Sequence, residues 1–206
     1  MPVVLVANPK GGVGKSTLAT QVAGYFASRG RAVMLGDVDR QQSSRLWLSL
    51  RPASAAPIAT WEATDTEGVV RPPKGTTHAV LDSPAGLHGK RLREVLALSD
   101  RVIVPLQPSI FDIYATRDFL DRLKEQRNAA RTRIGLVAMR VDGRTLAAER
   151  LREFTAGLGL PVIGEVRDTQ NYVQLAARGL SVFDVAPWRV QRDLEQWRPI
   201  CAWLEG

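Results

Sequence analysis

The residues from Lys10 to Thr17 have the types and spacing of a phosphate-binding loop. They read Lys-Gly-Gly-Val-Gly-Lys-Ser-Thr and directly follow the apolar run at 3–7. The general pattern Gly-x-x-x-x-Gly-Lys-Ser/Thr fits loosely, since its first position does not fall on a glycine. The variant Lys-Gly-Gly-x-Gly-Lys-Ser/Thr fits completely, and it has a lysine at each end.

Each residue type in this loop has a physical task in binding an anion. Glycines at 11, 12 and 14 allow positive φ and let backbone N–H groups approach phosphate oxygens. A helix beginning near Lys15 adds the positive end of its dipole. We expect Lys15 to reach the β- and γ-phosphates and the Ser16 hydroxyl to ligate Mg²⁺. The candidate nucleotide-binding residues of the loop are Lys10, Gly11, Gly12, Val13, Gly14, Lys15, Ser16 and Thr17.

Lys10, the extra lysine, has two interpretations. It lies too early in the chain to duplicate Lys15 on the same phosphate without bending back. It is therefore either a solvated surface lysine or a cation that reaches a nucleotide held by a second subunit. Position within the loop does not decide between them.

Three aspartates follow apolar strand patterns. Asp82 comes after the run 79–81, where it can hold Mg²⁺ through a water, opposite Ser16. Asp37 and Asp39 are spaced by one residue, so they project to the same side of an extended chain. One of the pair could sit in the metal shell while the other orients the attacking water. The alternative is that both acids cap the helix after Gln41.

Short apolar runs alternate with helical patterns along the chain, which predicts an α/β fold. We expect a mostly parallel central sheet with helices on both faces and ligands at the carboxyl ends of the strands. The predicted strands are 3–7, 32–35, 58–61, 79–81, 102–105, 133–139 and 161–163. The predicted helices are 18–28, 42–50, 87–98, 114–128, 147–157, 172–177 and 188–204. We interpret residues 1–206 as a single domain.

The composition of the chain restricts which kinds of partner it could bind and which cell compartment suits it. The chain has 206 residues, a formal net charge of +7, and 28 basic residues of which only five are lysine. This balance indicates either a polyanionic partner or arginine scattered over a solvated surface. The single cysteine, Cys201, excludes an internal disulfide or a multi-cysteine metal site and fits a reducing cytosol. No stretch is long and apolar enough to span a bilayer.

Four segments together resemble the ParA/MinD family of partition and positioning ATPases. They are Lys10–Thr17, Asp37-Val38-Asp39 followed by Gln41, Leu81–Gly86, and Ser99–Pro105. Segments Gln107-Pro108-Ser109 and Ser181–Asp184 extend the likeness to the short ParA/ParF-type partition proteins. The likeness covers about Val3 to Asp184 and becomes weaker in the last helix.

The resemblance implies roles for individual residues. Lys10 matches the lysine that crosses an ATP-sandwiched dimer, Lys15 the phosphate lysine and Ser16 the Mg²⁺ ligand. Asp39 matches the acid that positions water for hydrolysis. Asp37 is then a supporting or metal-shell acid, and Asp82 matches the second acid near Mg²⁺.

Two further residue expectations come from the family pattern. The family usually has proline after the second acid, whereas this chain has Arg40. Proline fixes φ and arginine does not, so Arg40 implies a looser loop or a contact with phosphate or DNA. Adenine recognition in the family comes from late loops, which match the stretch around Pro187 and Val190.

The implied function is an ATP-dependent dimer that binds nucleoid DNA and moves a plasmid, a chromosome region or a protein cargo. A ParB/ParG-like adaptor would stimulate its weak hydrolysis, and the protein would be cytoplasmic and nucleoid-associated. Because the loop begins so early, we expect no N-terminal helix-turn-helix and only sequence-independent DNA contacts. The candidate arginines are Arg150, Arg152, Arg167, Arg178, Arg189 and Arg192.

Two other function classes share these motifs. A MinD-like membrane-associated regulator would use the last predicted helix, which contains Trp188, Trp197 and Trp203, as an amphipathic anchor. Acids and Pro199 in that helix favour core packing instead. An iron–sulfur reductase on the same fold would need more cysteines than Cys201.

Overall fold

The computed structural model describes residues 1–39, 41–64, 68–126 and 131–206, and leaves the side chains of 110–112 undescribed. The prediction for Arg40 and the predicted helix end at 128 lie outside the described residues. The strands are β1 (Val3–Val6), β2 (Val33–Asp37), β3 (Ile58–Ala59), β4 (His78–Asp82), β5 (Arg101–Leu106), β6 (Arg133–Met139) and β7 (Val162–Val166). The helices are α1 (Lys15–Ser28), α2 (Ser43–Ser49), α3 (Gly89–Leu98), α4 (Ile110–Lys124), α5 (Leu146–Ala156), α6 (Gln170–Ala176) and α7 (Gln191–Glu205). Two 3₁₀ turns, η1 (Val182–Asp184) and η2 (Pro187–Arg189), precede α7.

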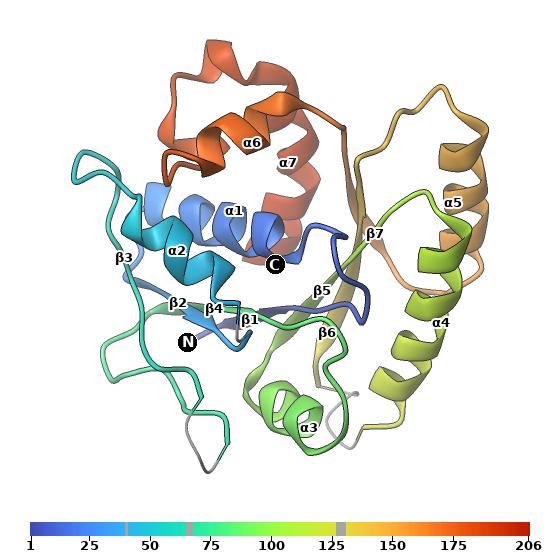
Figure 1. Cartoon of the computed structure of the whole chain (residues 1–206), viewed down its shortest axis with the longest axis horizontal. Helices are drawn as coiled ribbons and strands as arrows, with labels where there is room; N and C mark the ends of the chain where they lie inside the picture. Colours follow the sequence, from blue (N-terminus) through green and yellow to red (C-terminus); the bar gives the residue numbers. More distant parts are fainter. Residues whose placement is uncertain (40, 65–67, 127–130) are drawn as a thin grey trace.

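The strands form one sheet in the order β3-β2-β4-β1-β5-β6-β7, and every pairing between these described strands is parallel. Parallel neighbours require crossover connections, which the helices supply on both faces (Figure 1). The predicted α/β class with a parallel central sheet is confirmed.

The side chains of β1 alternate between the two faces of the sheet and contribute to two separate core layers. Val4 and Val6 are completely buried in one cluster with residues of α1 and α7. Val3 and Leu5 point into a second cluster that contains residues of α3, α4 and α5. Because successive side chains of a strand face opposite ways, one apolar run supplies both layers. Each predicted strand and helix has a counterpart in the structure.

The predicted boundaries differ most at three helices. The first begins at Lys15, as the phosphate-loop pattern predicted, and three residues earlier than the apolar pattern indicated. The fourth covers Ile110–Lys124, earlier at both ends than predicted. The last begins at Gln191, since Val190 has an extended φ of −133° that separates α7 from η2.

The tryptophans of the C-terminal region divide into two groups. Trp197 is 1% exposed within the core, and α7 packs against β7. Core packing of the last helix is therefore confirmed for Trp197, whereas Trp188 lies in η2 and is 78% exposed. No helix of the described ranges is long and apolar enough to cross a membrane.

A buried ion pair joins the region after α2 to η1. Arg51 donates to both carboxylate oxygens of Asp184 at 2.7 and 3.0 Å, and the two side chains are 6% and 3% exposed. Arg51 also donates to the carbonyl groups of Ala56 and Gly179. Asp184 accepts a bond from the Ser181 N–H as well, so the pair has partners in addition to each other. The Ser181–Asp184 segment therefore acts as an anchor of the tertiary structure.

We expect Arg51→Ala to lower the free energy of unfolding by about 3–5 kcal/mol, because it leaves the Asp184 carboxylate buried without its cation. Urea unfolding followed by circular dichroism measures this change. The matched control is Arg152→Ala, which removes an arginine whose pair with Glu165 is much more exposed. Arg152→Ala should lower the free energy of unfolding by less than about 1 kcal/mol. Equal losses in the two variants would contradict the structural role of the buried pair.

Candidate nucleotide-binding site

The phosphate-binding loop connects β1 to α1 and has the geometry of an anion site. Gly12 and Gly14 have positive φ of 76° and 97°, and α1 begins at Lys15. A Cβ on Gly14 would lie 2.9 Å from the terminal Cε of Met139, which can shift, so this position needs glycine mainly for its positive φ. Gly11 lies outside the left-handed region, which corrects the expectation that all three glycines use positive φ.

Lys15 is held inside the loop in this structure. Its side chain is 8% exposed, and Nζ donates to the Lys10 carbonyl at 2.6 Å. Burial lowers the pKa of Lys15, while the nearby carboxylates of Asp82 and Asp39 act in the opposite direction. An ammonium buried among two carboxylates and loop carbonyls is positioned to exchange a backbone contact for a phosphate.

Asn8 fixes the loop to the sheet, and the sequence reasoning missed it. Its side-chain amide donates to the Pro105 carbonyl at 2.7 Å and to Thr116 Oγ1 at 3.0 Å. Its Oδ1 accepts the Lys10 N–H at 2.8 Å, and the residue is fully buried. The only sequence signal was a polar residue directly after a buried strand. Gln107 adds a bond from Nε2 to the Gly12 carbonyl at 3.0 Å.

Asp82 lies at the carboxyl end of β4 and is fully buried. Its Oδ2 accepts the Ser44 hydroxyl at 2.7 Å, whereas Oδ1 has no hydrogen-bond partner among the described residues. Burial raises the pKa of Asp82 to about 6, with a further contribution from the Asp37 carboxylate, while the hydroxyl groups of Ser16 and Ser44 and the Lys15 ammonium act against this rise. A buried carboxylate oxygen without a partner close to a phosphate loop fits a cation that arrives with its ligand.

Asp37 and Asp39 occupy different environments. Asp37 accepts N–H groups of Asp39, Ser44 and Arg45 at 2.9, 2.9 and 3.3 Å, and burial raises its pKa. The contacts with Ser44 and Arg45 match the capping alternative for Asp37, because these two N–H donors lie at the start of α2. The Asp39 carboxylate accepts the Gln41 N–H at 3.0 Å, and Asp39 lines the loop cavity.

A cavity of about 470 Å³ lies over the loop. Asp39 faces it together with much of the loop, whereas Val13 is buried and does not line it. Its lining residues are Gly11, Gly12, Gly14, Lys15, Ser16, Thr17, Asp39, Gln41, Ser43, Pro84, Ala85 and Arg140. Sequence reasoning missed Arg140, which follows β6 in a left-handed conformation with φ of 54°. An arginine after a strand matches no sequence motif. Arg140 reaches this cavity because the parallel sheet places the end of β6 at the same edge as the loop.

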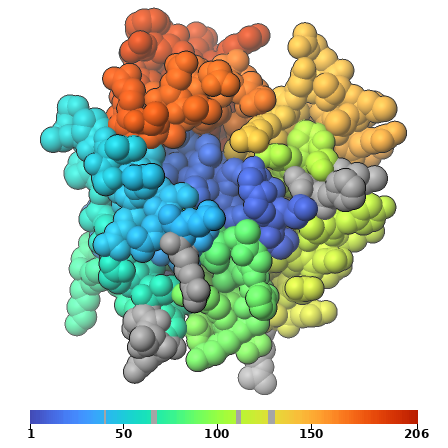
Figure 2. Space-filling view, in the orientation of Figure 1, coloured from blue at the N-terminus to red at the C-terminus, as the bar shows by residue number. Residues whose placement is uncertain are grey.

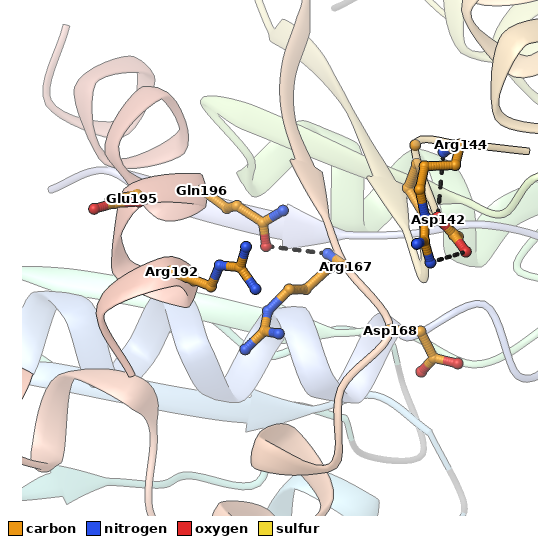
Figure 3. Close-up of a pocket in the computed structure, with 9 residues that line it drawn as sticks. Asp142, Arg144, Arg167, Asp168, Arg192, Glu195 and Gln196 are labelled. Carbon is orange, nitrogen blue, oxygen red and sulfur yellow. Dashed lines mark hydrogen bonds and ion pairs between the residues drawn. The ribbon is translucent and has the colours of Figure 1, made fainter. Parts of the chain in front are cut away.

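A second cavity of about 900 Å³ begins next to Arg140, because the segment Val141–Arg144 lines it. Figure 3 shows Arg167 after β7 and Arg192 of α7 extending into this space, opposite Asp142 and Arg144. The loop after β6 therefore borders both cavities. Neither Pro187 nor Val190, the predicted adenine contacts, lines either cavity, and Val190 is 4% exposed.

Two of the six candidate DNA-binding arginines have partners within the chain. Arg152 forms two bonds of 2.8 Å with Glu165. Arg167 donates to Asp193 at 2.8 Å, and that carboxylate is fully buried. Arg150, Arg152, Arg178, Arg189 and Arg192 are exposed, and DNA binding by the six candidate arginines stays a prediction.

The described residues contain no group of three or more His, Cys, Asp or Glu side chains that could hold a metal ion. A metal here would depend on Ser16, Asp82 and the phosphate oxygens of a bound nucleotide. Such shared ligation is typical of Mg²⁺ in phosphate-loop enzymes. The geometry therefore supports a nucleotide site and not a free-standing metal centre.

The profile of the CobQ/CobB/MinD/ParA nucleotide binding domain matches residues 4–182. The chain belongs to this family. Members of the ParA/MinD group are ATPases, and this chain is a ParA/MinD-type ATPase of the class that acts in partitioning or positioning. The Lys10–Thr17 loop, which the structure places at the carboxyl end of β1, is the segment expected to hold the nucleotide.

Relatives of known role support this assignment. The chain is 26% identical over 186 residues to the maintenance of carboxysome distribution protein A of Halothiobacillus neapolitanus, covering 87% of this chain and 86% of the relative. It is 28% identical over 183 residues to the chromosome-partitioning ATPase Soj of Thermus thermophilus, covering 72% and 73%. The fold resembles a putative plasmid partition protein of Borrelia burgdorferi B31 bound to AMPPNP, with 16% identity, a TM-score of 0.72 and 98% of each chain covered.

We expect Asn8→Ala to weaken nucleotide binding about tenfold, because it leaves the Lys10 N–H and the Pro105 carbonyl without their partner and loosens the loop. Titration with a fluorescent ATP analogue measures the dissociation constant, and a thermal melt shows whether the fold persists. Gln107→Ala is the matched control, since it removes a single bond to the same loop. An Asn8→Ala protein that binds nucleotide like the wild type would exclude a positioning role for Asn8.

Proposed function

We propose that ATP joins two copies of this chain, that the resulting dimer binds DNA without sequence preference, and that hydrolysis releases it. The observation that carries the proposal is the loop with two lysines in different settings. Lys15 is buried and lines the 470 Å³ cavity, whereas Lys10 is not among the residues that line it. A lysine that is close to the loop but outside its own cavity is available to a nucleotide held by a second subunit.

Mg²⁺ is proposed as the cation of this site, with Ser16 and Asp82 as its protein ligands. The unpaired Oδ1 of Asp82 supports this assignment. When bound with the nucleotide, the ion would neutralise charge on the phosphate oxygens. Asp37 keeps a supporting role, since its oxygens already accept three backbone N–H groups.

Asp39 is proposed as the residue that orients the attacking water. It is the carboxylate that lines the loop cavity, and its described hydrogen bond leaves acceptor capacity free. The nucleoside would extend from the loop towards the 900 Å³ cavity, because the segment after β6 borders both spaces.

The exposed arginines support a salt-dependent DNA contact. A dimer presents each of them twice, so weak individual contacts combine into a site that ATP controls. The cargo is proposed to be a plasmid, a chromosome region or a protein assembly, joined through a ParB/ParG-like adaptor that stimulates hydrolysis on the nucleoid. Co-sedimentation with ATP on DNA and on liposomes tests this proposal against a MinD-like role. Binding to liposomes alone would overturn it.

We expect Lys10→Ala to abolish ATP-dependent dimerisation and DNA binding while each monomer still binds nucleotide. The physical reason is loss of the cation that neutralises the partner's phosphates. Light scattering after size-exclusion chromatography with ATP and Mg²⁺ measures the mass. Lys124→Ala serves as control, because it removes a surface lysine that lies 3.8 Å from Asp121. A Lys10→Ala protein that dimerises normally would contradict the role in trans.

We expect Asp39→Ala to bind ATP, form persistent dimers and hydrolyse very little, because the attacking water loses its orienting carboxylate. A phosphate-release assay measures turnover, and the same light-scattering experiment follows the dimer over time. Gln41→Ala, a change to another residue of the cavity lining, should retain turnover. Normal ATP turnover by Asp39→Ala would assign the water to another residue.

A further inference from the structure

Trp188 is the most exposed of the large hydrophobic side chains described, with 78% of its surface accessible. It lies in η2, between α6 and α7 and directly after Ala186 and Pro187. Of the two other tryptophans at this end of the chain, Trp197 is buried and Trp203 is half-buried. An indole that could have been buried but faces solvent is typical of a contact surface, because aromatic residues give large contact area at little conformational cost.

Arg189 holds a fixed relation to this indole. Its guanidinium lies over the Trp188 ring, 5.6 Å from the ring centroid. A cation stacked on an aromatic face is attracted by the ring quadrupole and loses less freedom when it binds a further partner. Trp188 and Arg189 together, called here the Trp–Arg unit, therefore present a flat apolar ring with a guanidinium group stacked on it.

A shallow cavity of about 210 Å³ adjoins this unit, between α6 and η2. Its lining contains Arg178, Arg189, two amides and three aliphatic residues, and none of the lining residues carries a carboxylate. In Figures 1 and 2 the orange and red segments that contain α6 and η2 form one end of the molecule. The cavity is thus lined by hydrogen-bond donors and apolar groups.

The exposed charged side chains between Gln170 and Arg192 are all basic. From Gln170 to Arg192 the charged residues are Arg178, Asp184, Arg189 and Arg192. The one acid, Asp184, is buried and paired with Arg51. Asp193, the next acid, is also buried and accepts from Arg167 and Asn171. Asp168 and Glu195 line the neighbouring 900 Å³ cavity. The surface around Trp188 is therefore complementary to a polyanion.

We propose that Trp188 and Arg189, with Arg178 beside them, form a contact with duplex DNA in which the indole packs on deoxyribose or base and the guanidinium groups bind phosphates. The inference rests on the proposed DNA binding and adds an apolar component to it. Arginine matches phosphate geometry with paired donors, and aromatic side chains on sugar or base supply energy that salt does not screen. An acidic peptide would satisfy the arginines, but the DNA backbone also offers alternating phosphates and apolar sugars within reach of one Trp–Arg unit.

The experiment measures binding of a fluorescein-labelled random-sequence duplex by anisotropy, with AMPPNP and Mg²⁺, between 50 and 300 mM salt, on the order of the range where phosphate contacts are lost. Trp188→Ala should weaken binding about tenfold at each salt concentration and leave the slope of log K against log salt unchanged. Arg189→Ala should reduce that slope by about one per subunit. Trp188→Phe should restore most of the affinity. Leu146→Ala, another exposed apolar side chain, is the control.

Two measurements separate the possible failures. Binding of a fluorescent nucleotide and ATP-dependent dimerisation should be the same in Trp188→Ala and wild type. If the wild type binds no DNA, the proposed function fails and this inference fails with it. If the wild type binds DNA and Trp188→Ala binds equally well, only the inference is overturned. Loss of nucleotide binding or dimerisation in Trp188→Ala would also overturn it, because Trp188 would then belong to the nucleotide site or to the subunit interface.

Discussion

The parallel pairing of β1, β2 and β4 is the constraint on which the candidate site depends. In this register Val6 lies beside Asp82, and Asp82 lies beside Asp37. The three strands end at one edge of the sheet. The phosphate loop and the acids, which are far apart in the sequence, therefore lie close together there. The apolar side chains of these strands, buried in two layers, stabilise the arrangement.

The site buries two groups of opposite charge whose hydrogen bonding a ligand would complete. Asp82 is buried with one oxygen unpaired, and Lys15 donates to a loop carbonyl in place of a phosphate. Burying such groups costs stability, and proteins retain that cost mainly at functional positions. Asn8 and Gln107 connect the loop to β5 and the segment after it, so the loop is positioned before a nucleotide arrives.

The arginines of this chain serve two purposes that composition alone does not separate. Arg51 and Arg167 neutralise buried carboxylates, and Arg152 pairs with Glu165 across α5 and β7. Others, such as Arg178 and Arg189, face solvent where no carboxylate lines the adjoining cavity. The net charge of +7 therefore includes arginines that neutralise carboxylates within the fold and arginines that face solvent. This division explains why a surface can be strongly basic although many arginines are structural.

Local sequence determined the elements and the loop. Apolar runs of strand length, alternating with helical periods, predicted each strand and helix. The residue types from Lys10 to Thr17 predicted the phosphate loop and the positive φ of Gly12 and Gly14, but not the different conformation of Gly11. These features depend on residues close together in the chain, so the local sequence pattern is enough to predict them. The aspartates that follow β2 and β4 were placed correctly at the sheet edge for the same reason.

Tertiary structure alone decided which side chains meet. Asn8 and Arg140 had no motif, because their contacts with α4 and with the loop cavity join residues far apart in the chain. Likewise, six candidate arginines were equivalent in the sequence until Glu165 and Asp193 were found beside two of them. Whether a charge is neutralised depends on partners that folding brings near, and whether Trp188 is buried depends on the turn that separates it from α7. The sequence by itself determined the loop and the order of the elements, and the packing of distant segments decided which charges and which tryptophan remain at the surface.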